Sequence, residues 1–172
     1  ALGLGQVAAS LFHLFTHGFF KAALFLCVGN IAHALGRSTA GVDDVGGMRK
    51  AMPVTYACFV AAALSLAGVW PLAGFYSKDA ILDAAWRQGG GYAAVGLLIA
   101  AASAFYIFRM LFLTFHGERP QQKRGGESPH EAGPAMFVPV VFLALGALAV
   151  GFLRREVSNL VLFGLKGLPM GI

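Results

Sequence analysis

Long stretches of this chain contain no fixed charge. Residues 51–77, 88–108 and 132–153 hold no Asp, Glu, Lys or Arg, and Lys21 is the only such residue in 1–35. About 20 residues of α-helix cross the ~30 Å hydrocarbon layer of a bilayer. Each stretch is long enough for a crossing, and so many in a short chain are not typical of a water-soluble fold. The pattern predicts an all-α, polytopic transmembrane helical bundle.

Polar positions divide this bundle into about four spans. The first lies within 6–35, which is longer than one crossing needs, so its helix could be tilted or interrupted near Gly18. The other spans are bounded by clusters of charge, glycine and proline. We expect them at 53–86, 92–115 and 134–153, separated by loops at 36–52 and 116–133 and by a turn at Gly89, Gly90 and Gly91.

The second span is expected to be a broken helix. Pro71 stands in its interior, between Gly68 and Gly74. Proline there removes a backbone hydrogen bond and clashes with the preceding turn. Such breaks persist at membrane depth where the freed groups face protein or a water-filled cavity. An amphipathic half-helix should follow and end near Trp86, which together with Arg87 is typical of an interfacial anchor.

Composition supports the membrane location and narrows the function. Only 12% of the residues are charged, against ~25% in soluble domains. The net charge of +5 does not indicate nucleic-acid binding, because the basic residues stand where the apolar stretches stop. Cys27 and Cys58 lie inside apolar stretches and are expected to be small buried side chains, with neither metal-ligand spacing nor a disulfide framework.

The basic residues also suggest an orientation. The loops at 36–52 and 117–133 carry six Lys and Arg and the opposite side carries four, which weakly favours these loops as cytoplasmic. The chain opens without a basic n-region or cleavage site and stops without a finished span. We therefore expect an internal fragment of a larger protein, with a transmembrane module at 1–155 and the start of a next segment at 156–172.

Three ionisable side chains share one face of the first span. His13, His17 and Lys21 are spaced at i, i+4 and i+8, so they drift by only about 40° and rise about 6 Å per step. Single waters can bridge such steps. Imidazole exchanges protons near neutral pH, and a lysine in low dielectric can also release its proton. This row predicts a proton wire, because intramembrane ionisable groups are functional candidates.

Structural interpretations of this row remain open. The two histidines could be hydrogen-bonding contacts between helices, and Lys21 could extend its ammonium to the membrane surface. A zinc site built on His13 and His17 has the right spacing, but no carboxylate or thiolate lies nearby in sequence to complete it. We assign no role to the remaining histidines, which are His33, His116 and His130.

A second pair of charges, Lys78 and Asp79, follows the expected break. A charge beside a broken helix can meet water and half-helix dipoles, which is how transporters build sites for coupled ions. In the alternative, both residues lie at the membrane surface, since Lys78 comes about 25 residues after Pro53. The break favours the functional interpretation.

Several segments of the chain are similar to one family in order and spacing. They read HLFTHGFFKAALFL, GGMRKAMPVTY, LSLAGVWPLAGFYSKDAIL, FYIFRMLFLTFHGE and SPHEAGPAMFVPVVFLALGALAVGFL. These segments resemble the largest antiporter-like subunit of respiratory complex I, known as subunit L of the bacterial NADH:quinone oxidoreductase and subunit 5 in mitochondria. The resemblance extends to about residue 155.

The resemblance implies a fold and a set of roles. The family has two inverted repeats of five helices, each with one broken helix, and this chain would hold the later part of the second repeat and the helix after it. His13, His17 and Lys21 would lie on a proton-conducting central axis. Lys78 would lead toward the exit side, with Asp79 beside it. The implied function is proton translocation across an energy-transducing membrane, coupled to electron transfer in other subunits.

The resemblance also implies partners and a location. The partners would be other membrane-arm subunits, the lipid bilayer and protons, in a bacterial plasma membrane. The chain would be part of a translocase without a redox site or bound cofactor of its own, because it has no Gly-rich dinucleotide turn and no cluster cysteines. Alternatives are the large subunit of an Mrp-type cation/proton antiporter, the membrane arm of a hydrogenase or ferredoxin-linked enzyme, and a structural scaffold, which would not need Lys21 and Lys78 to be buried.

Overall fold

The structure is a computed structural model that describes residues 7–36, 45–118 and 130–153. Within these ranges the chain forms helices and no strand, which confirms the expected all-α bundle. Three helical segments are long and apolar enough to cross a membrane. The helices are α1 (Val7–Ala34), α2 (Pro53–Ala67), α3 (Ala73–Gln88), α4 (Gly90–Leu111), the π-helical η3 (Phe112–His116) that continues α4, and α5 (Pro134–Phe152).

The first span is one continuous helix. α1 has 28 residues and passes through Gly18 without interruption. At 1.5 Å per residue it is about 42 Å long, which exceeds the ~30 Å of a hydrocarbon layer. The long apolar stretch therefore forms one long helix, and the helix is not interrupted near Gly18.

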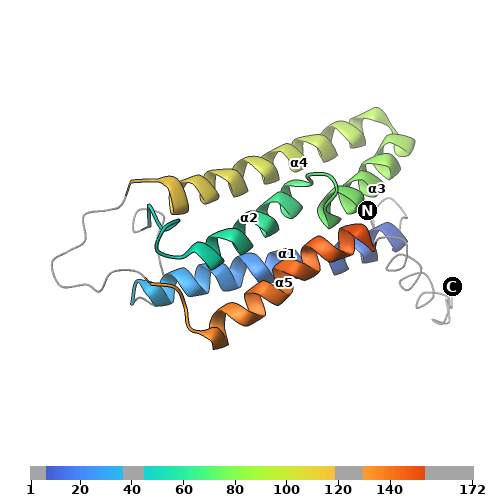
Figure 1. Ribbon diagram of the computed structural model, residues 1–172. Coiled ribbons are helices and arrows are strands. Elements are labelled where there is room, and N and C mark those ends of the chain that lie inside the picture. The colour runs from blue at the N-terminus through green and yellow to red at the C-terminus, as the bar shows by residue number, and fades with distance from the viewer. Residues whose placement is uncertain (1–6, 37–44, 119–129, 154–172) are drawn as a thin grey trace.

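The second expected span is divided in two. α2 ends at Ala67, and Gly68 closes it in the left-handed conformation, with a φ of 84°. α3 begins only at Ala73, so the interruption around Pro71 is confirmed. Figure 1 shows α2 and α3 following one another along the bundle, while α1 covers a similar length without interruption.

The turn between α3 and α4 is shorter than expected. α3 ends at Gln88 and α4 begins at Gly90, so Gly89 alone separates the two helices. Its φ of 142° lies in the region that favours glycine. The prediction of a turn through Gly90 and Gly91 was wrong, because glycine lowers helix propensity by only about 1 kcal/mol and does not end a helix by itself.

The closest packing joins α1, α2 and α5. Phe59, Ala63 and Ala147 are fully buried there. Small side chains such as these let helix backbones approach closely, which drives helix association in membranes. Cys27 and Cys58 are also buried in this core, as expected, and neither forms a disulfide.

Several expectations fall on residues outside the described ranges. These include the segment 156–172 and most of the charges on which the orientation rests, namely Arg37, Arg119, Lys123, Arg124, Arg154, Arg155 and Lys166. The boundary at 155 and the cytoplasmic assignment of the two loops therefore remain predictions.

Candidate proton-transfer site

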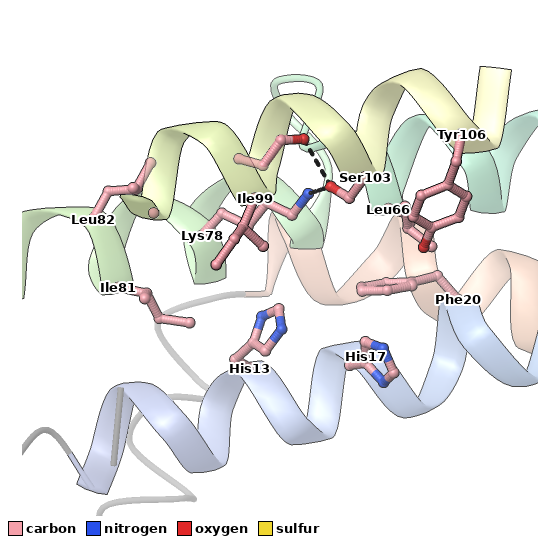
Figure 2. A pocket seen from close by; sticks show the side chains of 12 residues that line it. His13, His17, Phe20, Leu66, Lys78, Ile81, Leu82, Ile99, Ser103 and Tyr106 are labelled. Carbon is pink, nitrogen blue, oxygen red and sulfur yellow. Dashed lines mark hydrogen bonds between the residues drawn. The ribbon is translucent and has the colours of Figure 1, made fainter. Parts of the chain in front are cut away.

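A cavity of about 270 Å³ lies between α1, α3 and α4. Figure 2 shows His13 and His17 of α1 on one side, and Lys78 of α3 with Ser103 of α4 on the other. The break allows this arrangement, because α3 starts anew after Pro71 and is not a continuation of α2. The rest of the lining is mainly apolar, formed by Phe20, Leu66, Ile81, Leu82, Gly96, Ile99, Ala100 and Tyr106.

The two histidines occupy successive turns of α1. Their ring centroids are 5.7 Å apart. The Nδ1 atom of His13 lies 3.0 Å from the Oγ atom of Ser77, at the start of α3. The Ser77 hydroxyl also donates to the Gly74 carbonyl oxygen at 3.2 Å, and the His13 tautomer that carries its proton on Nδ1 donates to Ser77. This bond joins α1 to the first turns of α3, just after the break.

Lys78 reaches the cavity from the residue after Ser77. Its side chain passes 3.3 Å from the point where a Cβ atom on Gly68 would lie. Its Nζ atom donates a hydrogen bond of 2.8 Å to the Oγ atom of Ser103, whose hydroxyl donates at 2.7 Å to the Ala100 carbonyl oxygen. Among the described residues Lys78 has no carboxylate partner. A half-buried ammonium is therefore held by a neutral hydroxyl alone, which compensates its charge poorly.

The cavity gathers basic groups without a counter-charge from its own lining. If His13 and His17 were both protonated, their repulsion at 5.7 Å would be roughly 3 kcal/mol at an effective dielectric constant of about 20. Lys78 adds a further positive charge when protonated. The three groups therefore repel one another when they are charged together.

Two residues of the predicted site lie outside this cavity. Lys21, the third member of the row, does not line it, and its ammonium lies 5.3 Å from the centroid of the Phe25 ring. Phe25 is 67% exposed, so Lys21 sits beside an open face of α1. Asp79 is exposed on α3 and also does not line the cavity.

Ser77 and Ser103 were not predicted from the sequence. Each is a hydroxyl residue within or next to a charge-free apolar stretch. Such residues in membrane helices commonly bond across helices, and this was the signal available. Within the described ranges, no group of three or more His, Cys, Asp or Glu side chains could hold a metal ion.

Comparison with known proteins bears on the site. Residues 1–105 match the family described as "NADH:quinone oxidoreductase/Mrp antiporter, TM". This match includes α1, the break and every cavity residue except Tyr106. The chain belongs to this family. With its long apolar helices, it is an integral membrane protein.

One relative within this family is NADH-quinone oxidoreductase subunit L of Mycobacterium tuberculosis. It is 45% identical over 159 residues, which cover 88% of this chain and 24% of the relative. The chain thus spans about a quarter of the length of that curated relative.

Two solved structures are also similar. Respiratory complex I from Thermus thermophilus matches with a TM-score of 0.71 and 27% identity, over 90% of this chain and 34% of the matched chain. The Mrp complex from Dietzia sp. DQ12-45-1b matches with a TM-score of 0.77 and 24% identity, over 90% and 36%. At that identity the likeness to the Mrp complex shows the fold alone.

Proposed function

We propose that this chain is a proton-translocating part of the membrane arm of a bacterial NADH:quinone oxidoreductase. The observation that carries the proposal is the shared cavity of His13, His17 and Lys78 beside a broken helix. The family match and the similarity to a subunit L relative support it. The chain would lie in the plasma membrane with other membrane-arm subunits, and electron transfer in other subunits would drive it.

Within the cavity, protons would move between the histidines and Lys78. Protonated Lys78 donates to Ser103, and on losing a proton its amine would become an acceptor toward the cavity. Each histidine can bind a proton on one ring nitrogen and release one from the other. Water between the groups would complete the steps that direct hydrogen bonds do not span. The chain would bind no cofactor and carry no redox centre, so its share of the enzyme's work would be proton transfer.

Lys21 and Asp79 would act outside the cavity. Lys21 lies midway along α1, one turn beyond His17. It would relay protons between this cavity and an adjoining part of the complex. Asp79 would be a counter-charge whose distance from Lys78 or from another subunit changes during turnover, and such a change would shift the proton affinity of its partner.

A second candidate is the large subunit of an Mrp-type cation/proton antiporter. The family description includes both kinds of protein, and the structural match to an Mrp complex has the same fold. The two candidates make different demands on the parent protein. A sodium gradient imposed on vesicles without NADH should drive proton movement by an antiporter, but not by a subunit coupled to electron transfer.

The proposed function is tested by replacing the lysines in the assembled parent complex. Lys78→Ala and Lys21→Ala should each slow proton uptake by about tenfold, equivalent to ~1.4 kcal/mol of activation free energy. Lys→Arg should not restore it, because arginine does not release its proton in proteins. Proton uptake is measured in vesicles together with NADH oxidation, and a native gel confirms assembly.

Lys50→Ala is the matched control, because Lys50 is an exposed lysine outside the cavity. It should pump normally. Normal pumping by both Lys78→Ala and Lys21→Ala in an assembled complex would show that these lysines are structural and that the proposed function is wrong.

A further inference from the structure

The segment leading into α5, together with α5 itself, lies beyond the residues that match the family, yet it contacts the first turn of α2 and the break between α2 and α3. α2 has only 15 residues. It leads directly into the break, so its position sets where α3 can begin. Contacts at the start of α2 and at the break therefore bear on the placement of Lys78.

At the first end, Glu131 caps α2. Its Oε2 atom accepts hydrogen bonds from the backbone N–H groups of Val54, at 2.8 Å, and Thr55, at 3.3 Å. Its Oε1 atom accepts a bond of 2.5 Å from the Thr55 hydroxyl. A carboxylate in this place satisfies free N–H groups and complements the positive end of the helix dipole.

The same cap is connected to α1. The Asn30 side-chain amide donates to the Thr55 hydroxyl oxygen at 3.4 Å, and both residues are buried. Glu131 thereby fixes α2 along the axis of the bundle and against α1, the helix that carries the two cavity histidines. Sliding of α2 would break several bonds at once.

At the other end, Gly151 of α5 lies against the break. A Cβ atom at Gly151 would be 2.5 Å from the Pro71 carbonyl oxygen and 2.8 Å from the Ala73 backbone nitrogen. These are backbone atoms, so a larger side chain at Gly151 would force the start of α3 to move. Ser77, which bonds His13, lies one turn after Ala73, and Lys78 follows it.

We infer that Glu131 and Gly151 are positioning residues that hold the broken helix so that Lys78 and Ser77 reach the cavity. Glu131 holds the first half by charge and hydrogen bonds, and Gly151 holds the break by close backbone contact. α5 then fixes the position of the cavity side chains on α3 in addition to crossing the membrane. This inference rests on the proposed function.

The test replaces each residue in the parent protein within its complex. Glu131→Gln removes the charge, and Gly151→Ala adds one methyl group at the break. Each should lower proton uptake per electron by about twofold or more, because the rate of proton transfer falls steeply when the reacting groups move apart. NADH oxidation per assembled complex should stay unchanged, which a general loss of folding would not produce. Glu131→Asp, which keeps the carboxylate, should recover part of the uptake.

Matched controls are available in the described chain. Glu118→Gln changes an exposed glutamate, and Gly29→Ala adds a methyl group to a helical glycine with open space around it. Both should pump normally. Lys78→Ala and Lys21→Ala, measured in parallel, test the proposed function itself.

The outcomes separate the two ideas. If Lys78→Ala lowers uptake but Glu131→Gln and Gly151→Ala do not, the positioning role is wrong and the proposed function stands. If Lys78→Ala pumps normally, the positioning role fails, and the proposed function fails with it only if Lys21→Ala also pumps normally. If Gly151→Ala does not assemble, Glu131→Gln decides: normal uptake overturns the positioning role, and lowered uptake with unchanged NADH oxidation supports it.

Discussion

The two sides of α1 meet different surroundings. On one side α1 packs with α2 and α5 around fully buried side chains such as Phe59 and Ala147. On the other side it faces α3 and α4 across a cavity of about 270 Å³ that contains His13 and Lys78. Figure 1 shows α2 and α5 lying along α1, and α3 turning into α4, which runs back along the bundle.

This contrast shows what the broken helix contributes. A close-packed interface has no room for water or for a side chain that changes its charge. Dividing the second crossing keeps α2 in the core and leaves α3 free to take Lys78 to another helix, where it bonds Ser103. The packed core and the cavity that we propose for proton transfer thus lie on opposite faces of one helix, and substitutions on the two sides should differ in kind.

The largest expected effect is on the packed side. Phe59→Ala removes a fully buried ring that packs edge-on against Phe115, with centroids 5.3 Å apart. It should destabilise the chain by about 3–5 kcal/mol, because a cavity forms and packing contacts are lost. The measurement is the thermal midpoint and yield of the assembled complex. Phe105→Ala, at a ring that is 71% exposed, is the matched control and should change neither. Equal losses in both variants would contradict the contrast between the two sides.

An intermediate effect is expected at the cavity. Ser103→Ala removes the hydroxyl that accepts from Lys78. Leaving the ammonium without this partner costs ~1–3 kcal/mol, so proton uptake should slow by about tenfold or more while assembly stays normal. Ser103→Thr keeps the hydroxyl and should retain most of the uptake. If Ser103→Ala pumps as fast as Ser103→Thr, the hydrogen bond has no part in transfer.

The smallest effect is expected at the end of the packed side where α2 begins and η3 ends. The Tyr56 hydroxyl and the Nε2 atom of His116 lie 3.1 Å apart at an exposed position. Tyr56→Phe should cost only ~0.5 kcal/mol, because water replaces the lost partner. Thermal melting of the complex should show a small shift, and proton uptake per electron should be unchanged. A loss of uptake here would extend the functional region beyond the cavity.

The sequence by itself determined the spans and the break. A helix crossing a membrane must satisfy its own backbone hydrogen bonds, so its length and apolar character are local properties that can be read directly. The interruption at Pro71 is local for the same reason, because proline cannot donate the bond that a helix interior needs. The i, i+4 spacing likewise predicted that His13 and His17 share a face, and both line the cavity.

Only the tertiary structure decided which side chains meet. Lys21 continues the row of His13 and His17, yet it lies beside Phe25 and not in the cavity. The partnership of Lys78 with Ser103 and the cap of Glu131 on α2 join residues from separate helices and loops. Such contacts depend on how each helix is rotated and shifted against its neighbours. That placement is set by side-chain packing over whole surfaces, including close approaches such as Gly151 against the break, and no local spacing encodes it.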